Sequence, residues 1–315
     1  MSELTTFFDS AAGIILTAFT GVVYAIGFAV AYFRLKRARE NPTFRSRRIA
    51  LVGPARVGKT TTVISVLDQI RRGRIYNGSA RLRTEATIAR VAQLSAILND
   101  GGFPPSTRED ETNIYRFDYA IRLSSIFRLI FTMIGIGTLY RVEVADFAGE
   151  QSERYFLPIP SLKADELPDD YGLNASHNFL KWISESDVCV VFIDCELYST
   201  RGDEYVRSIT EKYVTFWSFY MDVHSDIFLD KKAPPVVLLY SKGDVLLPTN
   251  RVDFTMQMML EEQLNRAFRD LIVFLTANAA SVSTVVSSAI ARDTTSERLG
   301  VSELVHSILP RRGDF

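Results

Sequence analysis

The chain shows two hydrophobic periods, which together predict a sheet flanked by helices. Short apolar runs bounded by turn residues predict buried strands at residues 47–52, 188–193, 236–240 and 271–275. Apolar and polar residues alternate along 115–123, which predicts a half-buried strand and an antiparallel hairpin between 114 and 145. Helical spacing of apolar residues predicts helices at residues 60–72, 80–100, 203–223, 251–270 and 297–309. Because strands alternate with helices, we expect an α/β fold with a mostly parallel sheet.

The N-terminal segment has a different composition from the rest of the chain. Residues 10–33 carry no formal charge and are dense in Ala, Ile, Val, Phe and Gly. As a helix, this run would be about 36 Å long, enough to cross a hydrocarbon core of about 30 Å. Glu3 and Asp9 precede the run, and a series of Lys and Arg residues follows it at 34–48. This asymmetry predicts a transmembrane helix with the N-terminus outside and the remaining chain in the cytoplasm.

Two other interpretations of this run are weaker. A cleaved signal peptide would use Ala29-Val30-Ala31 as its cleavage site, but the residues before the run are acidic and the run is long for such a peptide. A buried core helix seldom extends this far without polar residues.

Residues 53–60 have the sequence G-P-A-R-V-G-K-T, which matches the Walker A phosphate loop in full. A strand is predicted before the loop and a helix after it, as the motif requires. Lys59 would neutralise the β- and γ-phosphates, and the Thr60 hydroxyl would hold Mg²⁺. The candidate phosphate-binding residues are Gly53, Pro54, Ala55, Arg56, Val57, Gly58, Lys59, Thr60 and Thr61.

Motifs at three later strand ends bear on the metal and the base. Asp146 ends the predicted strand at 142–145, and Gly149 follows three residues later. Ser241-Lys242-Gly243-Asp244 follows the strand at 236–240. The Asp244 carboxylate can accept two hydrogen bonds from guanine N1–H and N2–H₂, a donor pair that adenine lacks, and the Lys242 stem would cover the base. A weaker third motif, Thr276-Ala277-Asn278, follows the predicted strand at 271–275.

The order of these motifs resembles that of the translation-factor-related (TRAFAC) class of P-loop GTPases, which includes the Ras-like GTPases, over about residues 47–310. The loop P-x-x-T at 104–107 and D-x-A-G-E at 146–150 are more narrowly similar to the bacterial double-GTPase family. The resemblance implies a P-loop fold that binds GTP or GDP with Mg²⁺. It also implies that Asp146 orients Mg²⁺ through water, that the Gly149 N–H contacts the γ-phosphate, and that residues 276–278 contact guanine O6 through a backbone N–H.

The chain departs from the family pattern at three positions. Ser241 replaces Asn or Thr, so we expect a weaker bond between the base loop and the phosphate loop. Asn278 replaces Lys. Glu150 occupies the place of the Ras-like glutamine that positions the attacking water. A carboxylate can accept from that water but cannot donate to the transition state, so we expect slow hydrolysis with Lys59 and Glu150 as catalytic residues. The alternative is that Glu150 is solvated and has no catalytic role.

A switch threonine is needed on Mg²⁺ and the γ-phosphate. Thr107 is the first choice, because it follows a Gly/Pro-rich loop, and Thr112 is the second; either residue would be an ordinary loop threonine otherwise. The apolar stretch at 125–140 fits two core strands of the hairpin better than a loop that dips into the membrane. The aromatic residues at 213–220 are expected in the core.

These features predict four segments along the chain: an extracytoplasmic tip at 1–9, a transmembrane helix at 10–33, a basic linker at 34–46 and a P-loop GTPase domain at 47–315. The net charge of −1 favours no nucleic-acid partner. Cys189 and Cys195 lie in one predicted strand and cannot pair there, because that spacing exceeds the reach of a disulfide.

Expected partners are a guanine nucleotide, Mg²⁺, the membrane, and a protein effector or activator or a second copy of the chain. Two other functions stay open. One is a P-loop ATPase in which Asp194 is the Walker B carboxylate and Glu196 the base, and the other is a non-hydrolysing nucleotide-binding scaffold.

Overall fold

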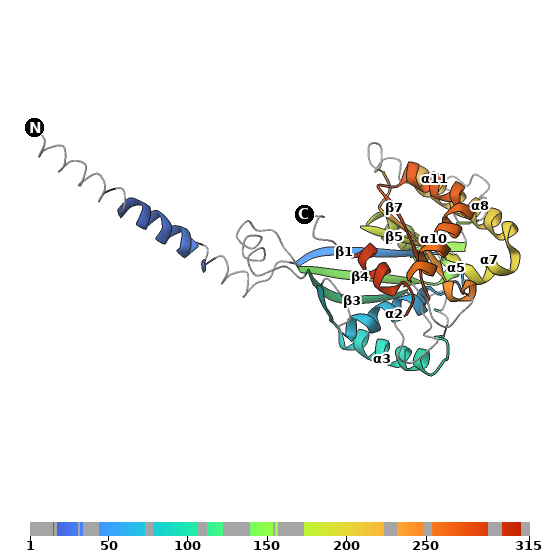
Figure 1. Ribbon diagram of the computed structural model, residues 1–315, viewed down its shortest axis with the longest axis horizontal. Helices are drawn as coiled ribbons and strands as arrows, with labels where there is room; N and C mark the ends of the chain where they lie inside the picture. Colours follow the sequence, from blue (N-terminus) through green and yellow to red (C-terminus); the bar gives the residue numbers. More distant parts are fainter. Residues whose placement is uncertain are drawn as a thin grey trace, which may run out of the picture. The chain divides into compact units, whose positions relative to one another are not determined.

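The computed structural model describes residues 15, 18–30, 32–33, 44–72, 78–105, 107, 112–121, 139–153, 155–156, 173–223, 232–247, 254–288 and 298–309. The chain forms two compact units, of which residues 46–121 and 141–314 form the one that contains the candidate site. The described strands make a 7-stranded sheet in the order β2-β3-β4-β1-β5-β6-β7 (Figure 1). Their bounds are β1 Phe44–Val52, β2 Gly78–Leu82, β3 Thr112–Ile121, β4 Leu139–Phe147, β5 Val188–Asp194, β6 Val236–Ser241 and β7 Val282–Val286.

The sheet is mostly parallel and flanked by helices, as predicted. β1 pairs with β5, β5 with β6 and β6 with β7 in parallel, whereas β2 pairs with β3 in antiparallel fashion. After β1, the described helices are α2 Lys59–Arg71, α3 Glu85–Asn99, α5 Gly149–Glu153, α6 Leu173–Ser184, α7 Cys195–Arg201, α8 Asp203–Val223, η2 Gly243–Leu246, α10 Phe254–Ala267, α11 Arg269–Asn278 and α12 Val301–Ile308.

Successive side chains of a strand point to opposite faces of the sheet, so a strand whose residues are all buried is covered on both faces. Every residue of β5 and β6 is buried, which is typical of parallel strands between two helical layers. The residues on one face of β5 belong to a core cluster with residues of α6, α8, α10 and α11, while Val190 and Phe192 on the other face lie beside residues of α2 and α12. The predicted core aromatics of α8 are confirmed, because Tyr213, Phe216, Trp217 and Tyr220 are all buried.

One predicted element is wrong, and another begins later than expected. The run 271–275 is part of helix α11 rather than a strand; Leu271 and Leu275 are buried, whereas Val273 is 60% exposed. Five consecutive apolar residues fit either element, and the four-residue spacing of the buried ones is helical. The strand after β6 is instead β7. The helix expected at 80–100 begins at Glu85, because the preceding residues form β2 and bond to β3, a long-range pairing that local periodicity does not report.

Part of the predicted membrane segment lies outside the described residues. Residues 15, 18–30 and 32–33 are helical and exposed. Within the described part of the chain, no helix combines the length and apolar character needed to cross a bilayer. β1 begins at Phe44, inside the predicted linker. The apolar stretch 125–140 lies outside the described residues except for its last two positions. Both cysteines are free and buried, and Cys195 is the first residue of α7 rather than part of the strand.

Candidate functional site

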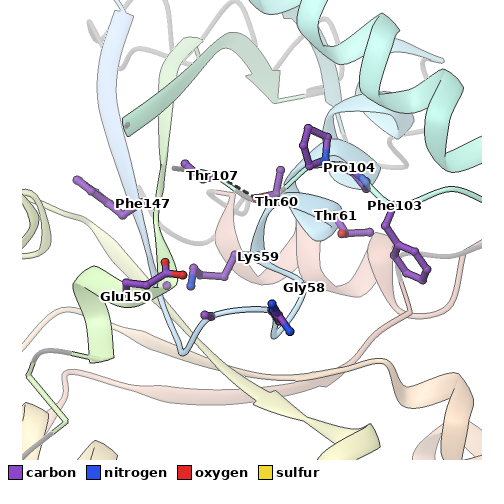
Figure 2. A pocket seen from close by; sticks show the side chains of 13 residues that line it. Gly58, Lys59, Thr60, Thr61, Phe103, Pro104, Thr107, Phe147 and Glu150 are labelled. Atoms are coloured by element: carbon purple, nitrogen blue, oxygen red, sulfur yellow. Dashed lines mark hydrogen bonds between the residues drawn. The ribbon is translucent and has the colours of Figure 1, made fainter. Parts of the chain in front are cut away.

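The phosphate loop connects β1 to the N-terminus of α2, as the sequence predicts (Figure 2). Two of its residues have left-handed backbone conformations, Arg56 with φ 62° and Gly58 with φ 94°. Gly58 adopts this conformation without steric cost and is the N-cap of α2. No side chain caps the helix, and its first turn holds no acidic residue. The N-terminus of α2 therefore suits a bound anion.

Lys59 is buried beneath this loop. Its ammonium donates to the carbonyl oxygens of Gly53 at 2.6 Å and Pro54 at 2.9 Å. Burial lowers the pKa of Lys59 to about 8, although the charges of Asp146, Glu150 and Glu153 act in the opposite direction. A bound phosphate would restore the preference for the charged ammonium, because an opposite charge favours the ionised form.

Three predicted metal ligands lie together at the ends of different segments. The Thr60 hydroxyl donates to Asp146 Oδ2 at 2.7 Å, and the Thr107 hydroxyl donates to the same oxygen at 3.2 Å. The two threonine hydroxyls are 3.2 Å apart (Figure 2). Thr112, the second choice for the switch residue, is the exposed first residue of β3. The structure thus places Thr107 beside Asp146.

Asp146 provides a test of whether a cation fits this position. Burial raises its pKa, and the hydrogen bond from Thr60, the charge of Lys59 and the hydrogen bond from Thr107 oppose that rise. Its Oδ1 atom is buried and accepts no hydrogen bond from any residue that the structure describes. Leaving such an oxygen unpaired is costly, so a cation or its bound water fits here.

A metal ion at this position would depend on more than protein carboxylates. Among the described residues, no cluster of three or more His, Cys, Asp or Glu side chains could hold a metal by itself. Mg²⁺ typically binds one or two carboxylates together with phosphate oxygens and water, so this donor set is compatible with Mg²⁺.

A cavity of about 320 Å³ opens in front of the phosphate loop. Phe103, 70% exposed, lies at its edge, and Glu150 and Lys59 point into it from α5 and α2 (Figure 2). The sequence interpretation did not assign Phe103, Pro105 or Phe147 to the site, although the Gly/Pro-rich loop around Phe103 was a signal. The lining residues are Ala55, Arg56, Gly58, Lys59, Thr60, Thr61, Phe103, Pro104, Pro105, Thr107, Phe147, Gly149 and Glu150.

Helix α5 packs directly on the phosphate loop. A Cβ atom on Gly149 would lie 2.2 Å from the Ala55 Cα, so only glycine fits at this position. The Ala55 N–H donates to Glu153 Oε1 at 2.9 Å, and the Gly53 N–H lies 3.5 Å from the Ser152 hydroxyl. Sequence reasoning missed both Ser152 and Glu153. The Ala55 N–H is one of the loop amides expected to bind phosphate. In this structure it donates instead to the carboxylate of Glu153.

The base-loop motif lies at the end of β6 and is bonded to the phosphate loop. The Ser241 hydroxyl lies 2.8 Å from the Val57 carbonyl oxygen and 3.0 Å from that of Ile193, which can each accept its proton. The bond between the two loops is therefore present, although serine replaces the usual asparagine or threonine. Asp244 is partly buried in η2, two residues beyond Lys242.

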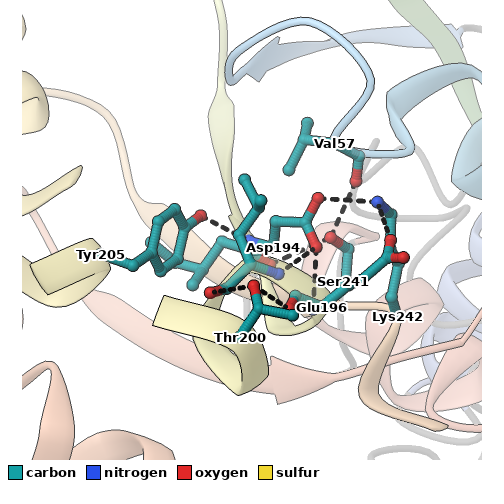
Figure 3. Close-up of polar contacts among 9 residues, drawn as sticks. Val57, Asp194, Glu196, Thr200, Tyr205, Ser241 and Lys242 are labelled. Atoms are coloured by element: carbon teal, nitrogen blue, oxygen red, sulfur yellow. Dashed lines mark hydrogen bonds and ion pairs between the residues drawn. The ribbon is translucent and has the colours of Figure 1, made fainter. Parts of the chain in front are cut away.

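Lys242 makes ion pairs with both acidic residues of the alternative Walker B site (Figure 3). Its ammonium lies 2.7 Å from Asp194 Oδ2 and 2.9 Å from Glu196 Oε2. Asp194 Oδ1 also caps α7 by accepting from the backbone N–H groups of Glu196 and Leu197. Neither carboxylate lines the cavity at the phosphate loop. This arrangement does not favour the ATPase interpretation.

The third predicted base motif is misplaced. Thr276, Ala277 and Asn278 form the last turn of α11, where Thr276 donates to the Ile272 carbonyl and Asn278 to that of Phe274. They belong to a helix, and do not follow a strand, because the run before them is helical. The segment beside the base loop is Ser287–Ser288, directly after β7.

Two backbone hydrogen bonds join Ser287 to the β6 end of the base loop. The Gly243 N–H donates to the Ser287 carbonyl at 3.0 Å, and the Ser287 N–H donates to the Tyr240 carbonyl at 2.9 Å. Residues 287–288 therefore take the place beside the base motif that the sequence assigned to 276–278.

No protein-family model matches the chain, and no curated protein sequence matches it.

Proposed function

We propose that the protein binds a guanine nucleotide with Mg²⁺, hydrolyses GTP slowly and acts as a nucleotide-dependent switch. The main support is the arrangement of Thr60, Thr107 and Asp146, whose buried Oδ1 atom lacks a partner among the described residues. A Walker A loop ends at Thr60, and Thr107 comes from a separate loop. An element that contacts the metal and the γ-phosphate from such a loop can be ordered by GTP and released after hydrolysis.

The proposed phosphate site uses the loop amides, the N-terminus of α2 and Lys59. Mg²⁺, when bound to Thr60, Thr107 and Asp146, would neutralise part of the phosphate charge. Glu150 lines the cavity from the first turn of α5, where its carboxylate can accept a hydrogen bond from water. It cannot stabilise the transition state as an amide donor, so we expect slow turnover that a protein activator or a second copy of the chain increases.

The proposed base site uses Asp244 and Lys242, with Ser287–Ser288 in the place of the misassigned 276–278. Support comes from the bonds that join the ends of β5, β6 and β7 around this motif. Guanine offers the donor pair that the Asp244 carboxylate can accept, and adenine would leave this carboxylate unpaired.

We also propose that residues 10–33 anchor the protein in a membrane, with its N-terminus outside and the nucleotide site in the cytoplasm. The uncharged run and the basic flank after it support this proposal. The protein should remain with the membranes during alkaline extraction. Release into the soluble fraction would contradict the anchor.

Affinity and turnover measurements on the purified full chain test the nucleotide proposal. GTP and GDP should bind more tightly than ATP and ADP, and GTP should be converted to GDP only with Mg²⁺. Tighter binding of ATP would contradict the guanine site. Guanine binding without any turnover, even in single-turnover experiments, would instead indicate the non-hydrolysing scaffold.

A further inference from the structure

An ion-pair cluster joins the end of β5 to the base loop after β6, outside the cavity at the phosphates (Figure 3). It consists of Asp194, Glu196 and Lys242, and the two acidic residues are the Walker B pair of the alternative ATPase interpretation. The Asp194 side chain is 5% exposed, whereas that of Glu196 is 59% exposed. The cluster therefore has one rigid buried carboxylate and one accessible carboxylate.

Asp194 is fixed from several directions before it binds Lys242. Its Oδ1 atom accepts from the N–H groups of Glu196 at 2.9 Å and Leu197 at 3.3 Å, and its own N–H donates to the Tyr205 hydroxyl at 2.9 Å. Only its second oxygen, Oδ2, faces the ammonium of Lys242, at 2.7 Å. Lys242 thus binds to a carboxylate whose position the rest of the fold determines.

The backbone of Lys242 is also unusual. With φ 56° and ψ 33°, it is left-handed, a conformation that costs free energy for residues with a side chain and that concentrates at functional sites. Burial acts to lower the pKa of Lys242, but the hydrogen bonds with Asp194 and Glu196 outweigh it and raise the pKa overall. The side chain is charged and held at its tip.

We infer that Asp194 and Glu196 are positioning residues for the nucleotide base, because they hold the Lys242 ammonium so that its aliphatic stem forms one wall of the base site. This inference rests on the proposed guanine site. A free lysine side chain would lose rotamer freedom when it packs on a base. A stem held before the nucleotide arrives has already lost that freedom, so affinity for the base increases.

The ion pairs are not needed to join β5 to β6. The two strands already pair from Cys189–Val236 to Asp194–Ser241, and the Ser241 hydroxyl reaches the Ile193 carbonyl. A role at the Lys242 side chain therefore explains the cluster better than a role in the sheet.

The test compares Asp194→Asn in the full chain with the wild type. The new amide oxygen can still cap α7, but the amide nitrogen that replaces Oδ2 cannot accept from Lys242. We expect GDP to bind about tenfold more weakly, as for the loss of a charged hydrogen bond, and tripolyphosphate, which contacts only the phosphate loop, to bind unchanged. Glu196→Gln should weaken GDP binding about threefold, and the exposure of this side chain makes misfolding of that variant a small risk.

Lys242→Met supplies the double-mutant control, because it keeps an unbranched side chain and removes the ammonium. In that background, Asp194→Asn should have no further effect on GDP affinity. Unchanged GDP binding in both single carboxylate variants would overturn the inference. So would an equal loss of GDP and tripolyphosphate binding, or the same loss in the Lys242→Met background.

The wild type separates failure of this inference from failure of the proposed function. If the wild-type protein binds ADP as tightly as GDP, both the proposed guanine site and the positioning role of Asp194 and Glu196 are contradicted. Guanine preference in the wild type with no effect of either carboxylate variant would remove the positioning role alone.

Discussion

The two ends of the candidate site are built in different ways. At the phosphate end, polar groups bond to one another: the Lys59 ammonium binds the carbonyl oxygens of its own loop, and the Ala55 N–H binds the carboxylate of Glu153. At the base end, Ser241, Lys242 and Gly243 are bonded to the ends of the neighbouring parallel strands. We therefore expect nucleotide binding to rearrange the phosphate end and to leave the base end nearly unchanged.

The largest expected effect is a change of base preference. Asp244→Asn replaces an acceptor with a group that also donates, which suits xanthine better than guanine. The ratio of GDP to XDP affinity should shift by about 1000-fold, because a site built for one hydrogen-bond pattern rejects the other strongly. Competition binding measures this ratio, and tripolyphosphate serves as the control for the phosphate end. An unchanged ratio would remove Asp244 from the base site.

The next effect tests whether a change at the phosphate end leaves the base preference unchanged. Lys59→Met should weaken GTP binding by about 100-fold, since it removes a charge-assisted contact from a buried position. The ratio of GTP to ATP affinity should stay constant, because the base end is built on other strands. Calorimetric titration of both nucleotides tests this expectation. If the ratio of GTP to ATP affinity changes by a similar factor, the two ends are not independent.

A smaller effect concerns the dependence of stability on pH. The pKa of Lys59 is about 8 in the folded protein against an ordinary value of 10.5, so the unfolded chain binds more protons between these values. Stability therefore rises with pH across this window. The free energy of unfolding of the wild type, compared with that of Lys59→Met, should increase by about 1 kcal/mol from about pH 7 to about pH 9. Denaturant unfolding of both proteins at each pH measures this difference in the free energy of unfolding. With saturating GTP, the rise should disappear, because phosphate stabilises the ammonium.

The smallest expected effect comes from the bond between α5 and the phosphate loop. Glu153→Gln makes the group on the Ala55 N–H neutral and a weaker acceptor, so GTP should bind about threefold more tightly. Glu150→Gln is the matched control, since it removes a nearby charge without touching that amide. Equal tightening by both variants would indicate a general effect of charge instead of competition for Ala55.

Local motifs and long-range contacts were predictable to different degrees. The phosphate loop and its flanking elements followed from the sequence, because a strand, a fixed glycine spacing and a helix are specified within a short segment. Leu271–Leu275 was misassigned because its five apolar residues fit both periods, and this error moved the third base motif from Ser287–Ser288 to 276–278.

Two contacts between distant segments, those of Glu153 and of Lys242, left no signal in the sequence. Glu153 reaches Ala55 and Lys242 reaches Asp194 only after the sheet has aligned the ends of its strands. The motifs therefore indicated which residues surround the site, whereas the partners that hold those residues depended on tertiary structure.

The contact between Glu153 and Ala55 can also be described as competition by a tethered ligand. A dissolved competitor weakens as it is diluted, but a carboxylate carried on α5 has an effective concentration that the fold determines. A phosphate that uses the same amide must displace this carboxylate, so its apparent affinity falls as the effective concentration of the carboxylate rises. For the proposed nucleotide, the concentration needed to fill the site would thus depend partly on how α5 is held against the loop, and dilution of the protein would not change this competition.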